Sequence, residues 1–221
     1  MRARAPAFPV NNTQLHHSTT DSSNSKNSGK ETLTHSLSSK HARRVRTCPE
    51  FSNMNTRRIV ILGFMGCGKT TVGEELARQL NCGFVDLDSF ISRREGRSPA
   101  EIITQDGQAA FRELETLALR DVLQDRQAHV IALGGGTWMK AANRTMVALF
   151  DCITVWLDTP FEICWERISN SRTARPLAPD SETAKRRFEE RRDFYALAER
   201  RIEVEPADTV ERVAEKLFRE T

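Results

Sequence analysis

The sequence predicts an α/β fold in which a five-stranded parallel sheet lies between two layers of helices. Short apolar runs alternate with amphipathic stretches from Arg57 onward, and this alternation is typical of parallel strands joined by crossover helices. The first apolar run, Ile59–Leu62, leads directly into a glycine-rich segment at 63–70. No internal repeat is visible, so we expect one domain of this three-layer α/β/α type over residues 54–221.

The individual elements follow from the periodicity of apolar residues. Strands are expected at 59–62, near 84–85, at 129–133, at 153–157 and near 201–204. Helices are expected at 69–80, from Ser98 for a short stretch, at about 108–124, after Pro160, at 182–199 and at 208–219. Ser98 and Glu101 form a capping box with Pro99 at the first helical position, which marks a helix start. The polar, basic segment around 170–187 contains two prolines, so we expect a mobile lid there.

Residues 63–70, Gly-Phe-Met-Gly-Cys-Gly-Lys-Thr, match the P-loop pattern G-x-x-x-x-G-K-[ST]. A buried strand precedes this loop and an amphipathic helix follows it, as phosphate binding requires. The glycines let backbone N–H groups turn toward phosphate oxygens, and the helix N-terminus adds about half a positive charge. Lys69 is expected to reach the β- and γ-phosphates, and the Thr70 hydroxyl to bind Mg²⁺. The ATP site is therefore predicted to include Gly63, Gly66, Cys67, Gly68, Lys69, Thr70 and Thr71.

Two carboxylates follow the second predicted strand, Asp86 and Asp88. Ligands of parallel sheets bind beyond the carboxyl ends of the strands, which is where both residues are expected. One carboxylate can support the hydration shell of Mg²⁺, and the other can accept the proton of an acceptor hydroxyl. The alternative interpretation is that Asp88 only caps the helix that follows.

Glycines and arginines reach the same edge of the sheet from later in the chain. Arg112 and Glu115 lie one helical turn apart, so the acid can orient the guanidinium, although on an exposed helix the same pair is worth little. Three consecutive glycines end the third strand and let the backbone approach a small ligand, unless they form a simple loop; these are Gly134, Gly135 and Gly136.

The last basic candidates lie in the expected lid and in the helix after it. Arg175 lies in the lid, where it can stabilise charge on the γ-phosphate. Arg191 follows on the helix, four residues before Tyr195. The arginines around it are expected to lie on the helix surface; these are Arg186, Arg187 and Arg192.

Six motifs, in this order, resemble those of the shikimate kinase family. They are the glycine loop, Asp86-x-Asp88, Phe111-Arg112-x-x-Glu115, the glycine triplet, Arg175-Pro-Leu177 and Arg191-x-x-x-Tyr195. The resemblance spans about residues 57–204 and implies a P-loop NTPase fold of the nucleoside-monophosphate-kinase type. It also implies ATP-dependent phosphorylation of the 3-hydroxyl of shikimate, a step of chorismate and aromatic amino acid biosynthesis.

The resemblance implies roles for individual residues as well. Arg112 and Arg191 would clasp the shikimate carboxylate, and the backbone of 134–136 would complete the substrate site. Asp88 would bind ring hydroxyls and orient or deprotonate the attacking one, while Asp86 and Thr70 would support Mg²⁺. Arg167 resembles the arginine that stacks on adenine. The residues with catalytic roles would be Lys69, Asp88 and Arg175.

Formal charge is distributed unevenly along the chain. Residues 1–53 hold eight Lys or Arg and three Asp or Glu, so this segment carries +5 although the whole chain carries +3. The remaining −2 gives no support to a nucleic-acid partner. The segment is either a disordered basic tail, because it has few apolar residues, or a transit peptide, or an upstream extension of a protein that starts at Met54. We favour the start at Met54.

Cysteine usage and hydropathy limit the cellular compartments and the partners that we expect for this protein. Five scattered cysteines without a C-x-x-C pattern indicate reduced thiols in the cytoplasm, whereas a transit peptide would direct the protein to an organelle. No stretch approaches the about 18 apolar residues of a membrane span. We expect a monomer that binds ATP, Mg²⁺ and shikimate, with no membrane or nucleic-acid partner.

Two other functions compete with this expectation. The first is gluconate kinase or another small-molecule P-loop kinase. The second is a kinase-like regulatory module without turnover. Such a module should have lost Lys69, Asp88 or a substrate arginine, and all of these are present.

Overall fold

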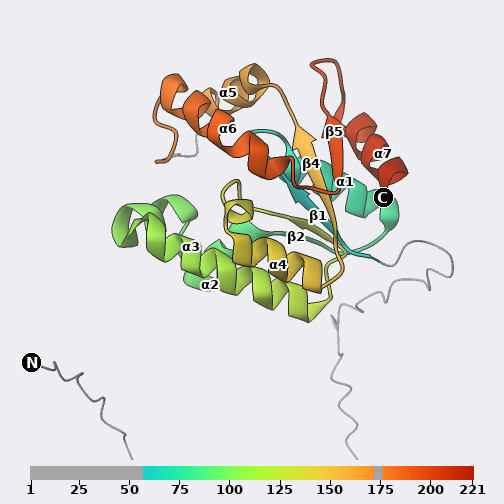
Figure 1. Cartoon of the computed structure of the whole chain (residues 1–221), viewed down its shortest axis with the longest axis horizontal. Helices are drawn as coiled ribbons and strands as arrows, with labels where there is room; N and C mark the ends of the chain where they lie inside the picture. Colours follow the sequence, from blue (N-terminus) through green and yellow to red (C-terminus); the bar gives the residue numbers. More distant parts are fainter. Residues whose placement is uncertain (1–56, 172–175) are drawn as a thin grey trace, which may run out of the picture. The chain divides into compact units, whose positions relative to one another are not determined.

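The computed structural model describes residues 57–171 and 176–221. Within this part of the chain, five parallel strands form one sheet in the order β2-β3-β1-β4-β5 (Figure 1). The strands are β1 (Ile59–Leu62), β2 (Phe84–Asp86), β3 (Val130–Ala132), β4 (Ile153–Asp158) and β5 (Arg200–Glu203). The predicted fold class is confirmed, and each strand end lies within one residue of its predicted position.

β1 lies at the centre of the sheet, and all four of its side chains are buried. Ile59 pairs with Val130 of β3 on one side and with Ile153 of β4 on the other. β3 and then β2 lie on one side of β1, and β4 and then β5 lie on the other side. The carboxyl end of β1 is therefore a topological switch point, where open parallel sheets bind their ligands.

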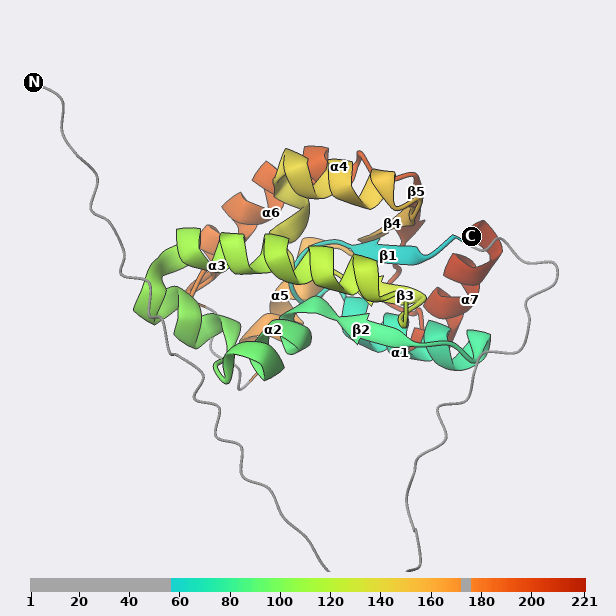
Figure 2. The ribbon, with the colours of Figure 1, turned by 90° about the horizontal axis from the view of Figure 1, so that it is seen from below.

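Helices cover both faces of the sheet. α1 (Lys69–Leu80) and α7 (Val210–Glu220) pack against each other on one face, whereas α4 (Ala141–Leu149) and α6 (Ser181–Tyr195) lie on the opposite face (Figure 2). α5 (Phe161–Ser169) packs against α6, and α3 (Pro99–Asp125) packs against both α2 (Leu87–Glu95) and α4. The three-layer arrangement follows from the apolar stripes of these helices.

The sequence does not predict α2, α4 or the short 3₁₀ helix η1 (Thr137–Met139). α2 begins at once after β2 and buries only Leu87 and Ile91. α4 buries only Asn143 and Val147. Because each short helix has two buried residues, neither shows the repeated apolar spacing that identifies longer helices.

The predicted boundaries of three other helices differ from the structure. The two helices expected from Ser98 and at 108–124 are segments of α3, which bends at Gly107 (φ 90°, ψ 160°). α6 ends at Tyr195 instead of 199, and α7 begins at Val210 instead of 208. Residues 181–187, placed in the expected lid, lie in α6. The lid residue Arg175 and the predictions for residues 1–53 and Met54 lie outside the described residues.

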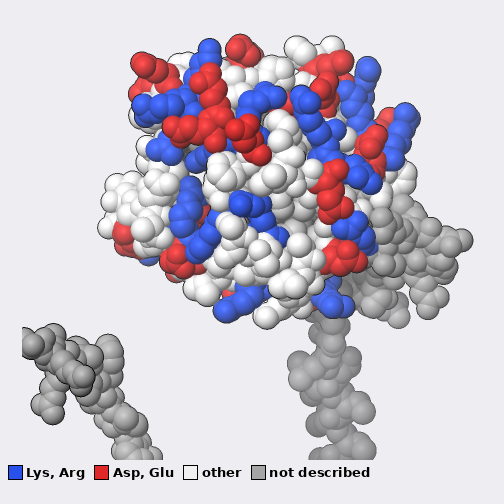
Figure 3. Space-filling model, in the orientation of Figure 1, with Lys and Arg blue, Asp and Glu red and all other residues white. Residues whose placement is uncertain are grey.

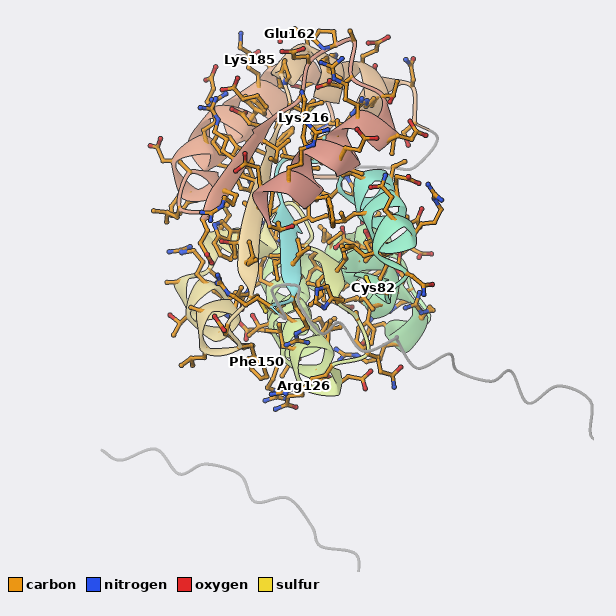
Figure 4. The ribbon with its side chains drawn as sticks, turned by 90° about the vertical axis from the view of Figure 1, so that its right-hand side faces the viewer. Cys82, Arg126, Phe150, Glu162, Lys185 and Lys216 are labelled. Atoms are coloured by element: carbon orange, nitrogen blue, oxygen red, sulfur yellow. The ribbon has the colours of Figure 1, made fainter. Side chains whose placement is uncertain are left out.

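The amino end of the sheet is held together by two arginines from the start of β1. Arg58 donates to the carbonyls of Val122 and Leu123 and lies over the ring of Phe150. Arg57 forms ion pairs with Asp151 and Glu199. Figure 4 shows Phe150 beside Arg126 at this end of the ribbon, and the two residues border the same hollow. All of these contacts lie at the amino end of the sheet, so none of them occupies the carboxyl ends of the strands.

Surface charge and the hydropathy of the helices are two general properties of the described residues. Lys and Arg side chains are interspersed with Asp and Glu over the face drawn in Figure 3, without a stripe of one sign. None of the helices in the described part of the chain has the length and apolar character needed to cross a bilayer.

Candidate active site

The glycine-rich loop between β1 and α1 is shaped by close packing around its glycines. Gly66 has φ 78°, and a Cβ there would lie 2.6 Å from the carbonyl oxygen of Cys164. Gly63, with φ 145°, would bring a Cβ to 2.8 Å from the Leu157 carbonyl oxygen. Only glycine fits both the backbone angles and the space at these two positions. Gly68 also has a positive φ and is the N-cap of α1.

Lys69 and Thr70 open α1 at the mouth of this loop. The Lys69 ammonium donates to the carbonyls of Gly63 and Phe64, at 3.1 and 2.9 Å. The Thr70 hydroxyl donates to Asp86 at 2.7 Å. Thr71 follows on the exposed side of the helix. A lysine beside the loop carbonyls and a hydroxyl–carboxylate pair thus lie within one turn of a helix N-terminus, which favours bound phosphate.

Asp86 and Asp88 have different structural roles, and the alternative interpretation that Asp88 caps the following helix is wrong. Asp86 ends β2 and caps α2, because its carboxylate accepts from the backbone N–H of Ser89 at 2.8 Å. Asp88 lies inside the first turn of α2, so it neither caps the helix nor continues an extended stretch. One of its carboxyl oxygens, Oδ1, is buried without a hydrogen-bond partner.

Burial and acidic neighbours raise the pKa of Asp88 to about 6. Desolvation is the largest cause, followed by the charges of Glu115 and Asp86; Lys69 and Arg112 act in the opposite direction. A carboxyl group with a raised pKa and a free oxygen is suited to take a proton from a hydroxyl near neutral pH.

Arg112 and Glu115 form a largely buried ion pair rather than a surface salt bridge. The Glu115 side chain is 1% exposed and accepts a second hydrogen bond from the Thr137 hydroxyl at 2.7 Å. A Cβ on Gly136 would overlap the Arg112 guanidinium. Glu115 therefore fixes the guanidinium against the backbone of the glycine triplet.

Gly134 and Gly135 connect this ion pair to Asp88 and to α6. A Cβ on Gly134 would lie 2.6 Å from Oδ1 of Asp88 and 2.7 Å from Oε1 of Glu115. The Gly135 carbonyl accepts from Arg191 at 3.0 Å and from the Tyr195 hydroxyl at 2.5 Å. The glycine triplet thus contacts Asp88, the Arg112–Glu115 ion pair and α6, and it is not a simple loop.

Two adjoining cavities occupy this end of the sheet. The larger, of about 690 Å³, is bordered by the glycine loop, Thr70, Asp86 and Arg167. The smaller, of about 100 Å³, is bordered by Arg112, Glu115, Gly136 and Arg191. Both cavities are bordered by Met65, Asp88, Pro99, Ala100 and Gly135. Two ligands bound here would meet beside the Asp88 carboxyl group.

The shikimate kinase family model matches residues 65–221. The chain belongs to the shikimate kinase family. A curated relative, the shikimate kinase of Microcystis aeruginosa, is 37% identical over 172 residues, which are 76% of this chain and 88% of the relative. The shikimate kinase of Sulfurihydrogenibium is 34% identical over 166 residues, or 74% of this chain and 99% of that protein.

A solved structure of the same family is similar in fold. The structure of shikimate kinase from Acinetobacter baumannii in complex with shikimate has a TM-score of 0.67 and 31% identity to this chain. The match covers 75% of this chain and 92% of that one. The resemblance to the shikimate kinase family predicted from six motifs is therefore confirmed.

The structure brings nearly all of the predicted site residues together. Those at the two cavities are Gly66, Cys67, Gly68, Lys69, Thr70, Thr71, Asp86, Asp88, Arg112, Gly135, Gly136, Arg167 and Arg191. Gly63 and Gly134 do not border either cavity, but Gly63 lies next to Cys67 and Gly134 lies next to Asp88. Arg167 donates to the Gly66 carbonyl at 3.2 Å. Arg175 lies outside the described residues.

Several residues of this shikimate kinase family member border the cavities although the sequence did not indicate them. The apolar ones outside the six motifs include Pro99, Ala100 and Ile103, while Met65, Pro176 and Leu177 lie within motifs but had no role assigned to them. The start of α7 also borders the larger cavity, at Asp208, Thr209, Val210 and Val213. Apolar side chains carry no chemical signal in a sequence. The Thr137 hydroxyl, directly after the glycine triplet, was the one polar group that could have been recognised from its position.

Proposed function

We propose that this protein transfers the γ-phosphoryl group of ATP to the 3-hydroxyl of shikimate. The observation that carries this proposal is the meeting of the two cavities at Asp88. The larger cavity has the glycine loop and helix N-terminus that suit a nucleoside triphosphate. The smaller has two arginines and a carboxyl group, which suit a small acid with several hydroxyls.

On the nucleotide side, the loop backbone and Lys69 bind the β- and γ-phosphates. Lys69 exchanges the carbonyls of Gly63 and Phe64 for phosphate oxygens, because a charged partner makes the stronger hydrogen bond. Arg167, held beside Gly66, borders the space where the adenine ring stacks. Arg175, from the lid, stabilises the charge on the transferred group.

On the acceptor side, Arg112 and Arg191 bind the carboxylate, and Asp88 binds the ring hydroxyls. The unpartnered oxygen of Asp88 accepts the hydrogen of the attacking hydroxyl. Its raised pKa keeps the carboxylate close to the protonation range in which it can take that proton near neutral pH. The buried contact between Glu115 and Arg112 keeps the guanidinium oriented during this step.

Mg²⁺ fits the oxygen pair of Thr70 and Asp86. These two oxygens lie 2.7 Å apart beside the phosphate loop, and Mg²⁺ is typically held by one or two protein oxygens together with phosphates and water. Within residues 57–171 and 176–221, no group of three or more His, Cys, Asp or Glu is arranged to hold a metal. When bound, the ion would neutralise charge on the β- and γ-phosphates. We further propose a monomer that acts in the cytoplasm.

A coupled assay of ADP release, with shikimate and gluconate as alternative acceptors, tests the proposal. We expect turnover with shikimate, no turnover with gluconate, and requirements for ATP and Mg²⁺. Lys69→Ala and Asp88→Asn should each abolish turnover while the fold remains intact by circular dichroism. Turnover with gluconate alone would overturn the proposal, and ATP binding without transfer to either acceptor would identify a regulatory module instead.

A further inference from the structure

Arg187 is half-buried on α6, one turn before Arg191, which borders the smaller (acceptor) cavity; the sequence predicted that it lies on the outer surface of the helix. Its neighbours along α6 are Ala184, three residues earlier, and Arg191, four residues later, and both are buried. Residues at these spacings lie side by side on a helix, with Cβ atoms roughly 6 Å apart. The half-buried Arg187 side chain therefore lies next to Arg191, which borders the smaller cavity.

The Arg187 guanidinium forms no ion pair with a carboxylate of the described residues, although the Glu190 charge lies near enough to act on it. Its Nε atom is buried without a hydrogen-bond partner, and no ion pair involves this residue. Burial and then the nearby charge of Arg191 lower its pKa, and Arg186 and Arg112 add to this effect, whereas the charge of Glu190 opposes it. Keeping a partly buried cation unpaired and beside other cations is unfavourable, so this arrangement favours an anion that comes from outside the chain.

The charges around the acceptor cavity also indicate that an additional cation would help to bind an anionic acceptor. Arg112 is already neutralised by the buried Glu115, and Asp88 adds a further negative charge. Arg191 donates to the neutral carbonyl of Gly135 and forms no ion pair within the described part of the chain. An acceptor that carries a carboxylate thus needs more positive charge than Arg112 and Arg191 supply against two acids.

We infer that Arg187 is a third cation of the acceptor site and binds the carboxylate of the substrate together with Arg191. This inference rests on the proposed function and adds a specificity-determining residue to it. Arg187 and Arg191 are one turn apart on a single helix, so their guanidinium groups can reach the two oxygens of one carboxylate. Arg112, held by Glu115, then orients the same group from the α3 side.

The test compares Arg187→Leu with two matched variants. Arg187→Lys keeps the charge. Arg186→Leu makes the same chemical change at the adjacent position, where the side chain is 69% exposed and lies 3.9 Å from Glu190. Kinetics are measured with shikimate and with the alcohol in which a CH₂OH group replaces its carboxylate. The KM for ATP and the thermal unfolding midpoint are measured in parallel.

We expect Arg187→Leu to raise the KM for shikimate about tenfold, the size of one lost ionic hydrogen bond. The kcat/KM for the alcohol and the KM for ATP should stay unchanged, and the unfolding midpoint should not fall, because the variant removes an unpaired, partly buried cation. Arg187→Lys should restore part of the affinity for shikimate, and Arg186→Leu should behave as the parent protein.

The alternative outcomes each contradict the inference in a recognisable way. Equal losses with shikimate and with the alcohol would indicate a structural role, and an unchanged KM for shikimate would indicate no role at this site. A rise in the KM for ATP alone would place Arg187 on the nucleotide side. If the parent protein did not phosphorylate shikimate, the proposed function itself would fail, before any variant was compared.

Discussion

At the scale of single residues, the carboxyl group of Asp88 combines burial with acidic neighbours. Its pKa is about 6 because desolvation, Glu115 and Asp86 all oppose its negative charge. Proton acceptance requires the ionised form, so kcat/KM for shikimate should fall about tenfold per pH unit below pH about 6. A pH profile of kcat/KM at saturating ATP measures this. An acid limb near the ordinary aspartate pKa of about 4 would contradict it.

The same pKa makes Asp88 a source of instability in the ligand-free protein. Its folded-state pKa lies above the value of 3.8 for an ordinary aspartate, so the folded state binds more protons and stability falls as pH rises from about 4 to 6. Asp88→Asn removes this effect. We expect the variant to gain up to about 3 kcal/mol over the parent protein at pH 7 and much less at pH 4. Urea unfolding at both pH values measures the difference, and a gain independent of pH would exclude this origin.

Gly134 is a residue where a single methyl group should disturb the acceptor site. Its Cβ would lie 2.6 Å from Asp88, 2.7 Å from Glu115 and 3.0 Å from Thr137. We expect Gly134→Ala to lower kcat/KM for shikimate roughly 10- to 100-fold, because displacement of positioned groups by about 1 Å has such effects. Gly96→Ala is the control, since a Cβ at Gly96 has nothing within 4 Å. The control should lose about 1 kcal/mol from its positive φ but keep its kinetics.

At the scale of elements, Asp158 connects three parts of the fold. It ends β4, is almost fully buried, and binds Arg192 of α6 at 3.2 Å and Arg201 of β5 at 2.6 Å. Both guanidinium groups lie over the ring of Trp156, at 5.3 and 5.2 Å. Arg192 is adjacent to Arg191, which borders the smaller cavity, so this cluster helps to hold α6 at the end of the sheet.

We therefore expect Asp158→Asn to lower stability by about 1–3 kcal/mol, the range for hydrogen bonds to charged groups. The KM for shikimate should rise more than the KM for ATP, because α6 contributes to the acceptor cavity. Thermal unfolding and steady-state kinetics measure the two effects. Glu190→Gln, which removes an exposed pair on the same helix, should change stability by less than about 0.5 kcal/mol. Equal rises of both KM values would mean that α6 keeps its position.

Sequence periodicity predicts the elements that bury an apolar stripe, and it fails where burial is sparse. β1 and α1 were predicted with their observed bounds because each buries four or more residues. α2 and α4 were missed because each buries only two. The position of α2 also explains why Asp88 does not cap a helix: α2 begins directly after β2, so Asp86 is its N-cap.

The site was predictable where a sequence motif indicates a chemical role, as in the glycine loop and at Arg112. Its supporting contacts were not, because they depend on distant parts of the chain. Thr137 contacts Glu115 across 22 positions, and Tyr195 contacts Gly135 across 60. The burial of Arg187 likewise depends on how α6 packs, while the sequence around it reads as an ordinary charged helix.

At the scale of the whole molecule, the two cavities and the family match involve the same part of the chain. The described residues that border the two cavities run from Met65 to Val213. The family model matches residues 65–221. The Sulfurihydrogenibium relative is covered over 99% of its length by 74% of this chain, so the rest of this chain has almost no counterpart in that relative.

A chain that begins at Met54 should therefore retain the activity of the full sequence. Each side chain assigned to the nucleotide or the acceptor, Arg175 included, follows this position, as do the paired arginines that hold the amino end of the sheet, Arg57 and Arg58. We expect unchanged kcat and unchanged KM values for both substrates, with stability within about 0.5 kcal/mol of the full chain. Steady-state kinetics and urea unfolding of the two proteins, measured side by side, test this. Lower activity in the shorter chain would show that residues 1–53 contribute to catalysis, because the loss would have no origin in the residues that border the cavities.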